Sequence, residues 1–134
     1  MNVPALVSAA VLGAHGIGHV IGWLPAWGLV SFEGVSRQSW ALDPVLGQRM
    51  SESVAGTVYL LPTIGFVAAA AALATGHPWS REVAVIAAIT SLLASVLFPV
   101  ALPPSSLVGS TALNLVVLGV ATWGQPLLTQ LGRP

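Results

Sequence analysis

Long runs of apolar residues alternate with short polar segments along the chain, and each run has the length of a membrane-spanning helix. The four runs cover residues 3–24, 53–75, 82–102 and 107–123. At a rise of about 1.5 Å per residue, a helix of about 20 residues crosses a hydrocarbon core of about 30 Å. The pattern therefore predicts an all-α fold, an integral membrane four-helix bundle that forms a single transmembrane domain over residues 1–134.

The connections between the runs differ in length. Residues 25–52 form the one sizeable connection, and they combine charged residues with Trp27, Phe32 and Trp40. We expect an amphipathic extramembrane loop that rests on the membrane surface or caps the bundle. The connections around residues 76–81 and 103–106 are short, so the second, third and fourth helices should run as antiparallel neighbours. An even number of spans places both termini on the same side.

Composition supports a membrane location and excludes several classes of protein. Only 6% of the residues are charged and 55% are hydrophobic, whereas soluble domains carry about 25% charged residues. The charged residues fall between the apolar runs or at their ends, as expected because a charge at the bilayer centre costs at least about 2.5–3.5 kcal/mol. The chain has no lysine, no basic cluster and no cysteine. We therefore expect no nucleic-acid partner, no disulfide and no thiolate metal site.

The first apolar run carries two of the three histidines, where charge is least welcome. At 3.6 residues per turn, His15, His19 and Trp23 stack on one helix face, beside a row of small residues that includes Ala14, Gly18 and Gly22. An imidazole in hydrocarbon needs hydrogen-bond partners, so we expect this face to point inward. The small residues favour close helix packing inside the bundle, and the same row would also suit a second copy or another membrane subunit.

Polar residues on the other three runs are the candidate partners of this face. We expect the following side chains to converge on His15, His19 and Trp23: Tyr59, Thr63, Ser91, Ser95 and Asn114. Two interpretations stay open. The group is either a structural hydrogen-bond network or the lining of a site for a lipophilic, quinone-like ligand.

Other chemistry is less well supported by the pattern. Two imidazoles four residues apart can share a metal ion, but no span offers a third ligand, and His77 stands in a turn. We therefore expect no metal, and we keep a redox subunit with haem or quinone at His15 or His19 as the alternative. A small transporter is a second alternative, which the absence of charge in the spans disfavours. No acid is placed to orient an imidazole, so the sequence favours a protein without catalytic residues.

The segment from His15 to Trp23 has the form His-Gly-x-x-His-x-x-Gly-aromatic. It resembles the start of a family of small, uncharacterised bacterial inner-membrane proteins. Those proteins have four spans, the last with a small-residue turn followed by asparagine, as in residues 110–114 here. The resemblance implies the topology, a bacterial cytoplasmic membrane and the choice of His15, His19 and Asn114 as residues to test. It implies no reaction.

The distribution of arginines bears on orientation. Arg37 and Arg49 lie on the first loop, while Arg81, Arg133 and the terminal amine lie at the opposite face. The positive-inside rule then places both termini in the cytoplasm by a thin margin. Taken together, we expect a multi-pass protein of the cell membrane that binds a lipophilic ligand or a partner membrane protein without catalysis.

Overall fold

The computed structural model describes the backbone of residues 3–131 and the side chains of residues 3–123. Arg133 and the end of the tail therefore lie outside the described residues. Within 3–131 the chain is all-helical and contains no strand. The helices are α1 (Val3–Gly18), α2 (Val20–Ala26), α3 (Asp43–Leu46), α4 (Gln48–Ala74), α5 (Ser80–Leu97) and α6 (Pro104–Leu131).

The predicted membrane bundle is confirmed. In the described part of the chain, four helical segments are long and apolar enough to cross a membrane: Val3–Ala26, Gln48–Ala74, Ser80–Leu97 and Pro104–Trp123. The first segment comprises α1 and α2. The protein is therefore a multi-pass membrane protein with four spanning helices.

Three helix boundaries differ from the sequence prediction by five residues or more, and one of them is the end of α6, which lies at Leu131 rather than near residue 123. Helix α4 begins at Gln48 rather than near residue 53, because Gly47, with a φ of 77°, makes the sharp turn between α3 and α4. The added first turns carry polar side chains such as Arg49 and Glu52, so they extend the helix beyond its apolar part. Helix α5 ends at Leu97 rather than near residue 102, because Pro99 cannot continue a helical hydrogen-bond ladder.

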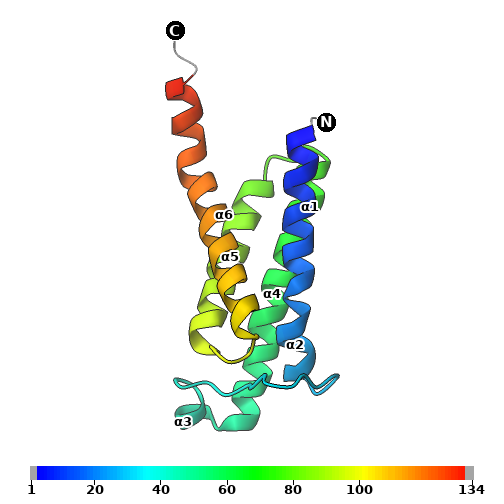
Figure 1. Cartoon of the computed structure of the whole chain (residues 1–134), viewed down its shortest axis with the longest axis vertical. Helices are drawn as coiled ribbons and strands as arrows, with labels where there is room; N and C mark the ends of the chain where they lie inside the picture. The colour runs from blue at the N-terminus through cyan, green and yellow to red at the C-terminus, as the bar shows by residue number, and fades with distance from the viewer. Residues whose placement is uncertain (1–2, 132–134) are drawn as a thin grey trace.

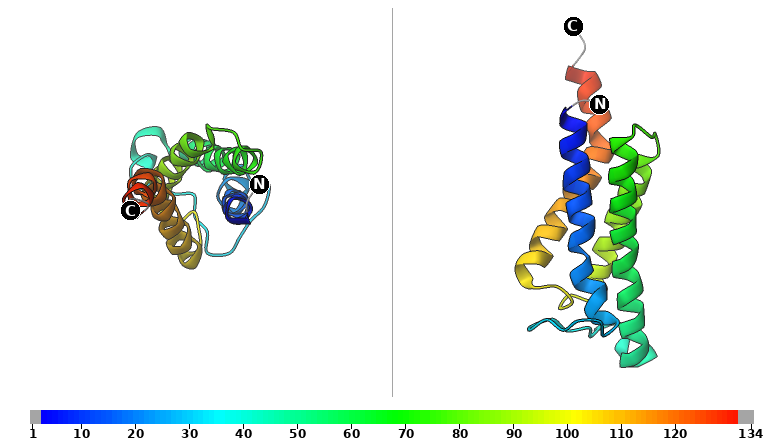
Figure 2. Two further views of the ribbon diagram at one scale, coloured as in Figure 1. Left: turned by 90° about the horizontal axis from the view of Figure 1, so that it is seen from above. Right: turned by 90° about the vertical axis from the view of Figure 1, so that its right-hand side faces the viewer.

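The spanning helices pack in chain order and form an arc. Helix α1 packs on α4, α4 on α5 and α5 on α6, so that α1 and α6 stand at the two ends of the arc (Figure 2). The start of α1 and the end of α6 lie at the same end of the bundle (Figure 1). We call this the terminus end, and the opposite one the loop end.

Glycine sets how closely the helices approach. A Cβ atom on Gly22 would lie 2.5 Å from Cγ of Tyr59, and one on Gly16 would lie 2.9 Å from Cβ of Phe66. Gly65 is equally tight against α5, since its Cβ would lie 2.8 Å from Cβ of Ala87. These distances are shorter than van der Waals contact, so glycine lets α1, α2 and α5 approach α4 more closely than a residue with a Cβ atom would allow.

The small-residue row of the first span behaves differently from the prediction. Gly22 is buried against α4, but Ala14 and Gly18 are exposed, and a Cβ on Gly18 would meet no atom within 4 Å. The expectation that the whole row packs inside the bundle is therefore wrong for Ala14 and Gly18. The reason is a break in the helix at His19, which gives the residues before and after it different faces.

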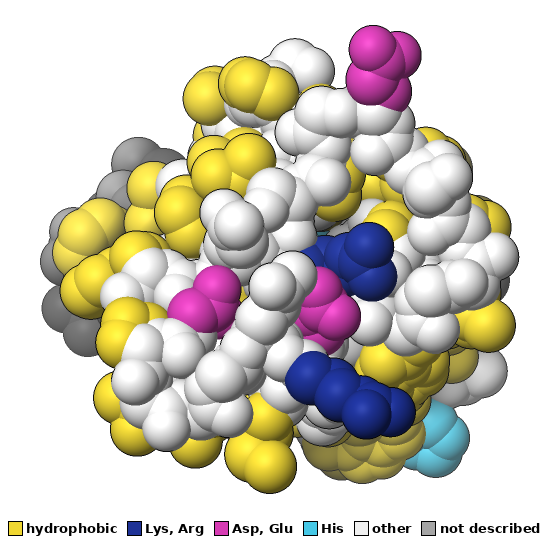
Figure 3. All heavy atoms as spheres, turned by 90° about the horizontal axis from the view of Figure 1, so that it is seen from below, with side chains coloured by type: hydrophobic (Ala, Val, Ile, Leu, Met, Phe, Trp, Pro, Cys, Tyr) yellow, Lys and Arg dark blue, Asp and Glu magenta, His cyan; other side chains and the backbone are white. Residues whose placement is uncertain are grey.

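The loop between α2 and α4 caps the loop end of the bundle, as expected. It crosses the lower end of the bundle in Figure 1, where the first turns of α4 extend below it. The Trp40 Nε1 atom donates a hydrogen bond to the carbonyl of Val96 over 2.8 Å. The backbone amide of Ser36 donates to the carbonyl of Val100 over 2.9 Å. Acidic and basic side chains are scattered over this face (Figure 3). The loop thus satisfies backbone carbonyls near the end of α5 and presents charge to the water.

Candidate functional site

The site begins with an interruption of the first spanning helix. The amide of His19 donates to the carbonyl of Gly16 over 3.2 Å, three residues back instead of four. The carbonyl of His15 therefore loses its usual helical donor. The imidazole of His19 replaces it, because His19 Nδ1 donates to this carbonyl over 2.9 Å. The side chain of His19 thus closes the break that separates α1 from α2.

This one bond determines the direction of the hydrogen bonds that follow. A carbonyl only accepts, so Nδ1 of His19 carries the proton, and Nε2 of the neutral ring is an acceptor. The Ser91 hydroxyl lies 2.6 Å from Nε2 and must donate to it. The Ser91 oxygen in turn accepts a hydrogen bond from Nδ2 of Asn114 over 2.7 Å. The amide oxygen of Asn114 then faces His15, whose Nε2 donates to it over 2.8 Å.

The result is a directional chain of hydrogen bonds that joins α1, α5 and α6, which we call the polar network. His19, Ser91 and Asn114 are buried, and His15 is partly exposed. The ring of Phe66 packs edge-on against His15, with ring centroids 4.6 Å apart. Buried polar groups in hydrocarbon cost free energy unless they are paired. The network pairs both ring nitrogens of His19, the Ser91 hydroxyl and the side-chain amide of Asn114. The network holds α6 to α1 across the open side of the arc.

The other predicted site residues lie nearby but outside the network. The Tyr59 hydroxyl donates to the carbonyl of Phe98 over 3.3 Å. Thr63 and Ser95 each donate to the carbonyl four residues earlier in their own helix. Trp23 packs against the ring of Trp27, with centroids 5.5 Å apart. The structure thus brings together His15, His19, Ser91 and Asn114, and it leaves Tyr59, Thr63, Ser95 and Trp23 as neighbours.

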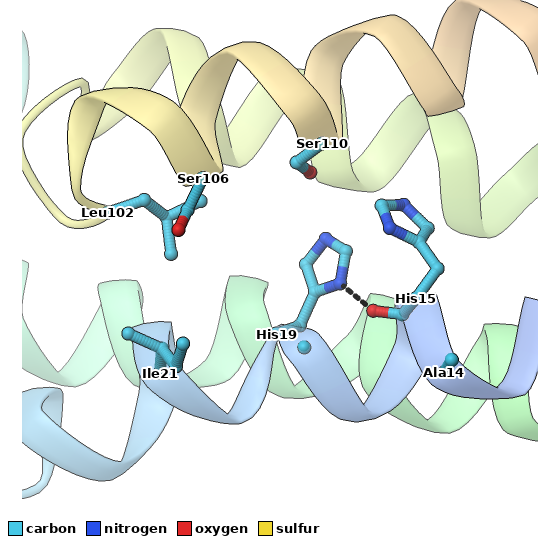
Figure 4. A pocket seen from close by; sticks show the side chains of 8 residues that line it. Ala14, His15, His19, Ile21, Leu102, Ser106 and Ser110 are labelled. Atoms are coloured by element: carbon cyan, nitrogen blue, oxygen red, sulfur yellow. Dashed lines mark hydrogen bonds between the residues drawn. The ribbon is translucent and has the colours of Figure 1, made fainter.

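A cleft of about 210 Å³ opens between α1 and α6 on the loop side of the network. We call it the loop-side cleft. Figure 4 shows Leu102, in the turn before α6, and Ser106 and Ser110 of α6 on the side of the cleft opposite α1 and α2. Its lining comprises Ala14, His15, Gly18, His19, Ile21, Leu102, Ser106 and Ser110. The exposed small residues Ala14 and Gly18 therefore form part of the wall of this cleft.

Two polar atoms in this lining lack partners in the described part of the chain. The Ser110 Oγ atom is buried and makes no hydrogen bond. His15 donates through Nε2, so Nδ1 of its neutral ring is an acceptor, and no described residue donates to it. A buried hydroxyl without a partner costs about 1–3 kcal/mol. A bound molecule that forms hydrogen bonds with both atoms would remove this cost.

Ser106 and Ser110 line the cleft but were not predicted as site residues. A signal was present, because Ser106, Ser110 and Asn114 are spaced four residues apart and so share one face of α6. Serine is common at helix interfaces in membranes, however, and the spacing alone does not separate packing from binding.

The two histidines lack the further protein ligands that a bound metal ion needs within the described residues. Among the described residues, no group of three or more His, Cys, Asp or Glu side chains is placed to hold a metal. Both ring nitrogens of His19 are engaged in hydrogen bonds, which leaves Nδ1 of His15 as the available nitrogen of the pair.

Comparison with protein-family models, with curated proteins and with solved structures gives no match. The family resemblance of the histidine segment therefore stays a prediction.

Proposed function

We propose that the protein binds a lipophilic molecule with a hydroxyl head group in the loop-side cleft, without catalysis. The observation that carries this proposal is the buried, unpaired hydroxyl of Ser110 in the wall of a cleft that His15 also lines. Polar groups that converge on an apolar cleft are the usual mark of a ligand site. A site of this kind in a spanning bundle is supplied from the bilayer.

The free atoms favour a particular head group. Nδ1 of His15 needs a donor, and the Ser110 hydroxyl can donate or accept. A single ligand hydroxyl can do both tasks, donating to His15 and accepting from Ser110. A quinone in its oxidised form offers only acceptors, whereas a quinol or a phenol offers the hydroxyl. The proposal thus favours a phenol-like or quinol-like lipid.

The size of the cleft supports a head group rather than a whole lipid. Its volume of about 210 Å³ is below the roughly 300–1,000 Å³ of pockets that enclose drug-sized ligands. The exposed Gly18 leaves the bilayer side of the cleft without a side chain. The apolar tail of the ligand would leave through this side into the lipid.

Two matched probes test the proposal. The first is 4-decylphenol and the second is its methyl ether, 4-decylanisole, which keeps the ring, the chain and the oxygen but has no hydroxyl proton. We expect the phenol to bind the purified protein in detergent about tenfold more tightly in calorimetric titration, because one hydrogen bond contributes about 1 kcal/mol or slightly more. Ser110→Ala should weaken the binding of both probes, because the oxygen of each accepts a hydrogen bond from the Ser110 hydroxyl, and Thr90→Ala, which changes a hydroxyl on α5 outside the cleft, should not.

A steric variant separates this cleft from general partitioning into the micelle. Gly18→Leu places a side chain in the cleft from a position where a Cβ meets no atom within 4 Å. We expect it to abolish phenol binding while the protein stays folded. Equal binding of the two probes, or binding that Gly18→Leu leaves unchanged, would refute the proposed site. If the wild type instead runs as an oligomer in gel filtration and Gly18→Leu runs as a monomer, a helix of another subunit is the occupant of the cleft.

The redox alternative draws on the same atom. Nδ1 of His15 is the ring nitrogen that a haem iron would use, since His19 uses both of its nitrogens in the network. Purified protein with a Soret absorption band would favour this alternative. A colourless preparation that binds the phenol would favour the ligand-binding function.

We propose further that the protein resides in a bacterial cytoplasmic membrane with both termini in the cytoplasm. The support is the positive-charge count given in the sequence analysis, in which Arg81, Arg133 and the terminal amine outweigh Arg37 and Arg49 by a thin margin. The chain has no cysteine, so single-cysteine variants report position directly. In intact spheroplasts, an impermeant maleimide should label Glu33→Cys and spare His77→Cys. The reverse pattern would invert the orientation.

A further inference from the structure

A second cleft separates α1 from α6 on the terminus side of the polar network. Its volume is about 480 Å³, more than twice that of the loop-side cleft. We call it the terminus-side cleft. It is lined by residues of all four spanning helices, and the His15–Asn114 hydrogen bond stands between the two clefts. It is therefore a site distinct from the one assigned above.

The lining of the terminus-side cleft is apolar over most of its length. Val11 and Leu12 of α1 face Leu113, Val116, Val117 and Val120 of α6. Branched aliphatic side chains cannot form hydrogen bonds with a ligand, so this wall provides a surface for a hydrocarbon chain. Several of these residues, Val11, Val116 and Val120 among them, are exposed in the isolated chain. In a bilayer, an acyl chain would cover them.

A positive charge stands at the membrane-surface end of this cleft. Arg81 lies in the first turn of α5, lines the cleft and donates a hydrogen bond to the carbonyl of Ala121 on α6. This bond uses one end of the guanidinium and leaves other N–H groups to bind an anion. Among the described residues no carboxylate forms an ion pair with Arg81, and residues 124–134 contain no Asp or Glu.

From these observations we infer that the terminus-side cleft binds an anionic phospholipid. One acyl chain lies along the apolar wall, and the phosphate pairs with Arg81. The geometry combines a long hydrocarbon surface with a cation at the depth of the lipid head groups. This combination of a basic residue and an interhelical cleft is the arrangement by which membrane proteins select anionic lipids.

The test compares two lipids with identical chains and different head-group charge. Purified protein in detergent is given dioleoyl-phosphatidylglycerol or dioleoyl-phosphatidylcholine, and retained lipid is counted by native mass spectrometry. We expect one phosphatidylglycerol per chain, bound about fivefold more tightly than phosphatidylcholine, because one basic residue near the surface contributes about that factor. Arg81→Gln should remove the preference, and Arg81→Lys should retain most of it.

Control variants separate the cleft from the rest of the surface. Arg49→Gln removes an exposed charge at the loop end and should leave the preference unchanged. Val120→Trp fills the cleft from an exposed position and should reduce retention of both lipids, whereas Ile89→Trp, which is exposed on α5 outside the cleft, should not.

The inference is overturned if the two lipids are retained equally, or if Arg81→Gln preserves the preference. It is also overturned if Arg49→Gln lowers the preference as much as Arg81→Gln does, or if Val120→Trp leaves retention unchanged. Circular dichroism and gel filtration of each variant verify the fold. Because the loop-side cleft takes no part, the phenol experiment and this one succeed or fail separately.

Discussion

The hydrogen bond between His15 and Asn114 should contribute measurably to the stability of the bundle. Asn114 makes two side-chain bonds, to His15 over 2.8 Å and to Ser91 over 2.7 Å. Side-chain hydrogen bonds between helices in a membrane contribute about 0.6 kcal/mol on average and up to about 1.7 kcal/mol. Asn114→Leu removes both bonds and should therefore lower the free energy of unfolding by about 1–3 kcal/mol. His15→Leu removes one bond and should cost about 1 kcal/mol.

A double-mutant cycle isolates the bond itself. After either single substitution the remaining partner is unpaired in an apolar environment, and in the double variant neither partner remains. The double variant should therefore be more stable than the sum of the single effects predicts, by about 0.6–1.7 kcal/mol. Unfolding in mixed micelles with increasing sodium dodecyl sulfate, followed by tryptophan fluorescence, measures each free energy.

The control cycle uses His77→Leu in place of His15→Leu. His77 lies in the turn after α4, where its ring stacks on Trp79, away from the network. Its effect should add to that of Asn114→Leu without coupling. A coupling below about 0.3 kcal/mol for His15 and Asn114 lies within the scatter of additive pairs and would refute the structural role of the bond.

Three further predictions use the same unfolding assay or simple spectroscopy. Gly22→Ala should destabilise the protein by about 1–3 kcal/mol through overpacking, since its Cβ would lie 2.5 Å from Cγ of Tyr59. Gly18→Ala, with open space around it, should change stability by less than about 1 kcal/mol. Equal effects of the two substitutions would contradict the packing described here. Ser91→Ala should cost about 1–3 kcal/mol because it leaves Nε2 of His19 and one amide hydrogen unpaired, and an unchanged unfolding midpoint would contradict the assigned directions. The purified protein should show no Soret band, and a haem stoichiometry near one would transfer the assignment to the redox alternative.

The apolar runs were sufficient to predict the four spans, because hydrocarbon solvent excludes charge over a length that the bilayer fixes. The polar residues within the runs predicted that His15 and His19 would meet partners on the other spans, since an imidazole in a span needs a partner. The pattern did not separate Ser91 and Asn114, which bond to the histidines, from Tyr59, Thr63 and Ser95, which bond to backbone carbonyls.

The break at His19 could not be predicted from the helical pattern. The proline that precedes it in the span, Pro4, lies in the first turn, where proline is tolerated. The interruption depends instead on the imidazole replacing a backbone amide as donor to the carbonyl of His15. Because a helical wheel assumes one continuous helix, it placed Ala14, Gly18 and Gly22 on one packed face. The separation of α1 from α6 could not be predicted either. It depends on which pairs of helices do not pack together, and residue spacing describes single helices only.

The position of the His15–Asn114 bond determines how the two clefts are separated from each other. His15 is near the middle of Val3–Ala26, and Asn114 is near the middle of Pro104–Trp123. The bond therefore lies midway along both spanning segments and divides the lateral opening of the bundle into the loop-side cleft and the terminus-side cleft. A molecule in one cleft would reach the other along the bundle only after this bond had broken.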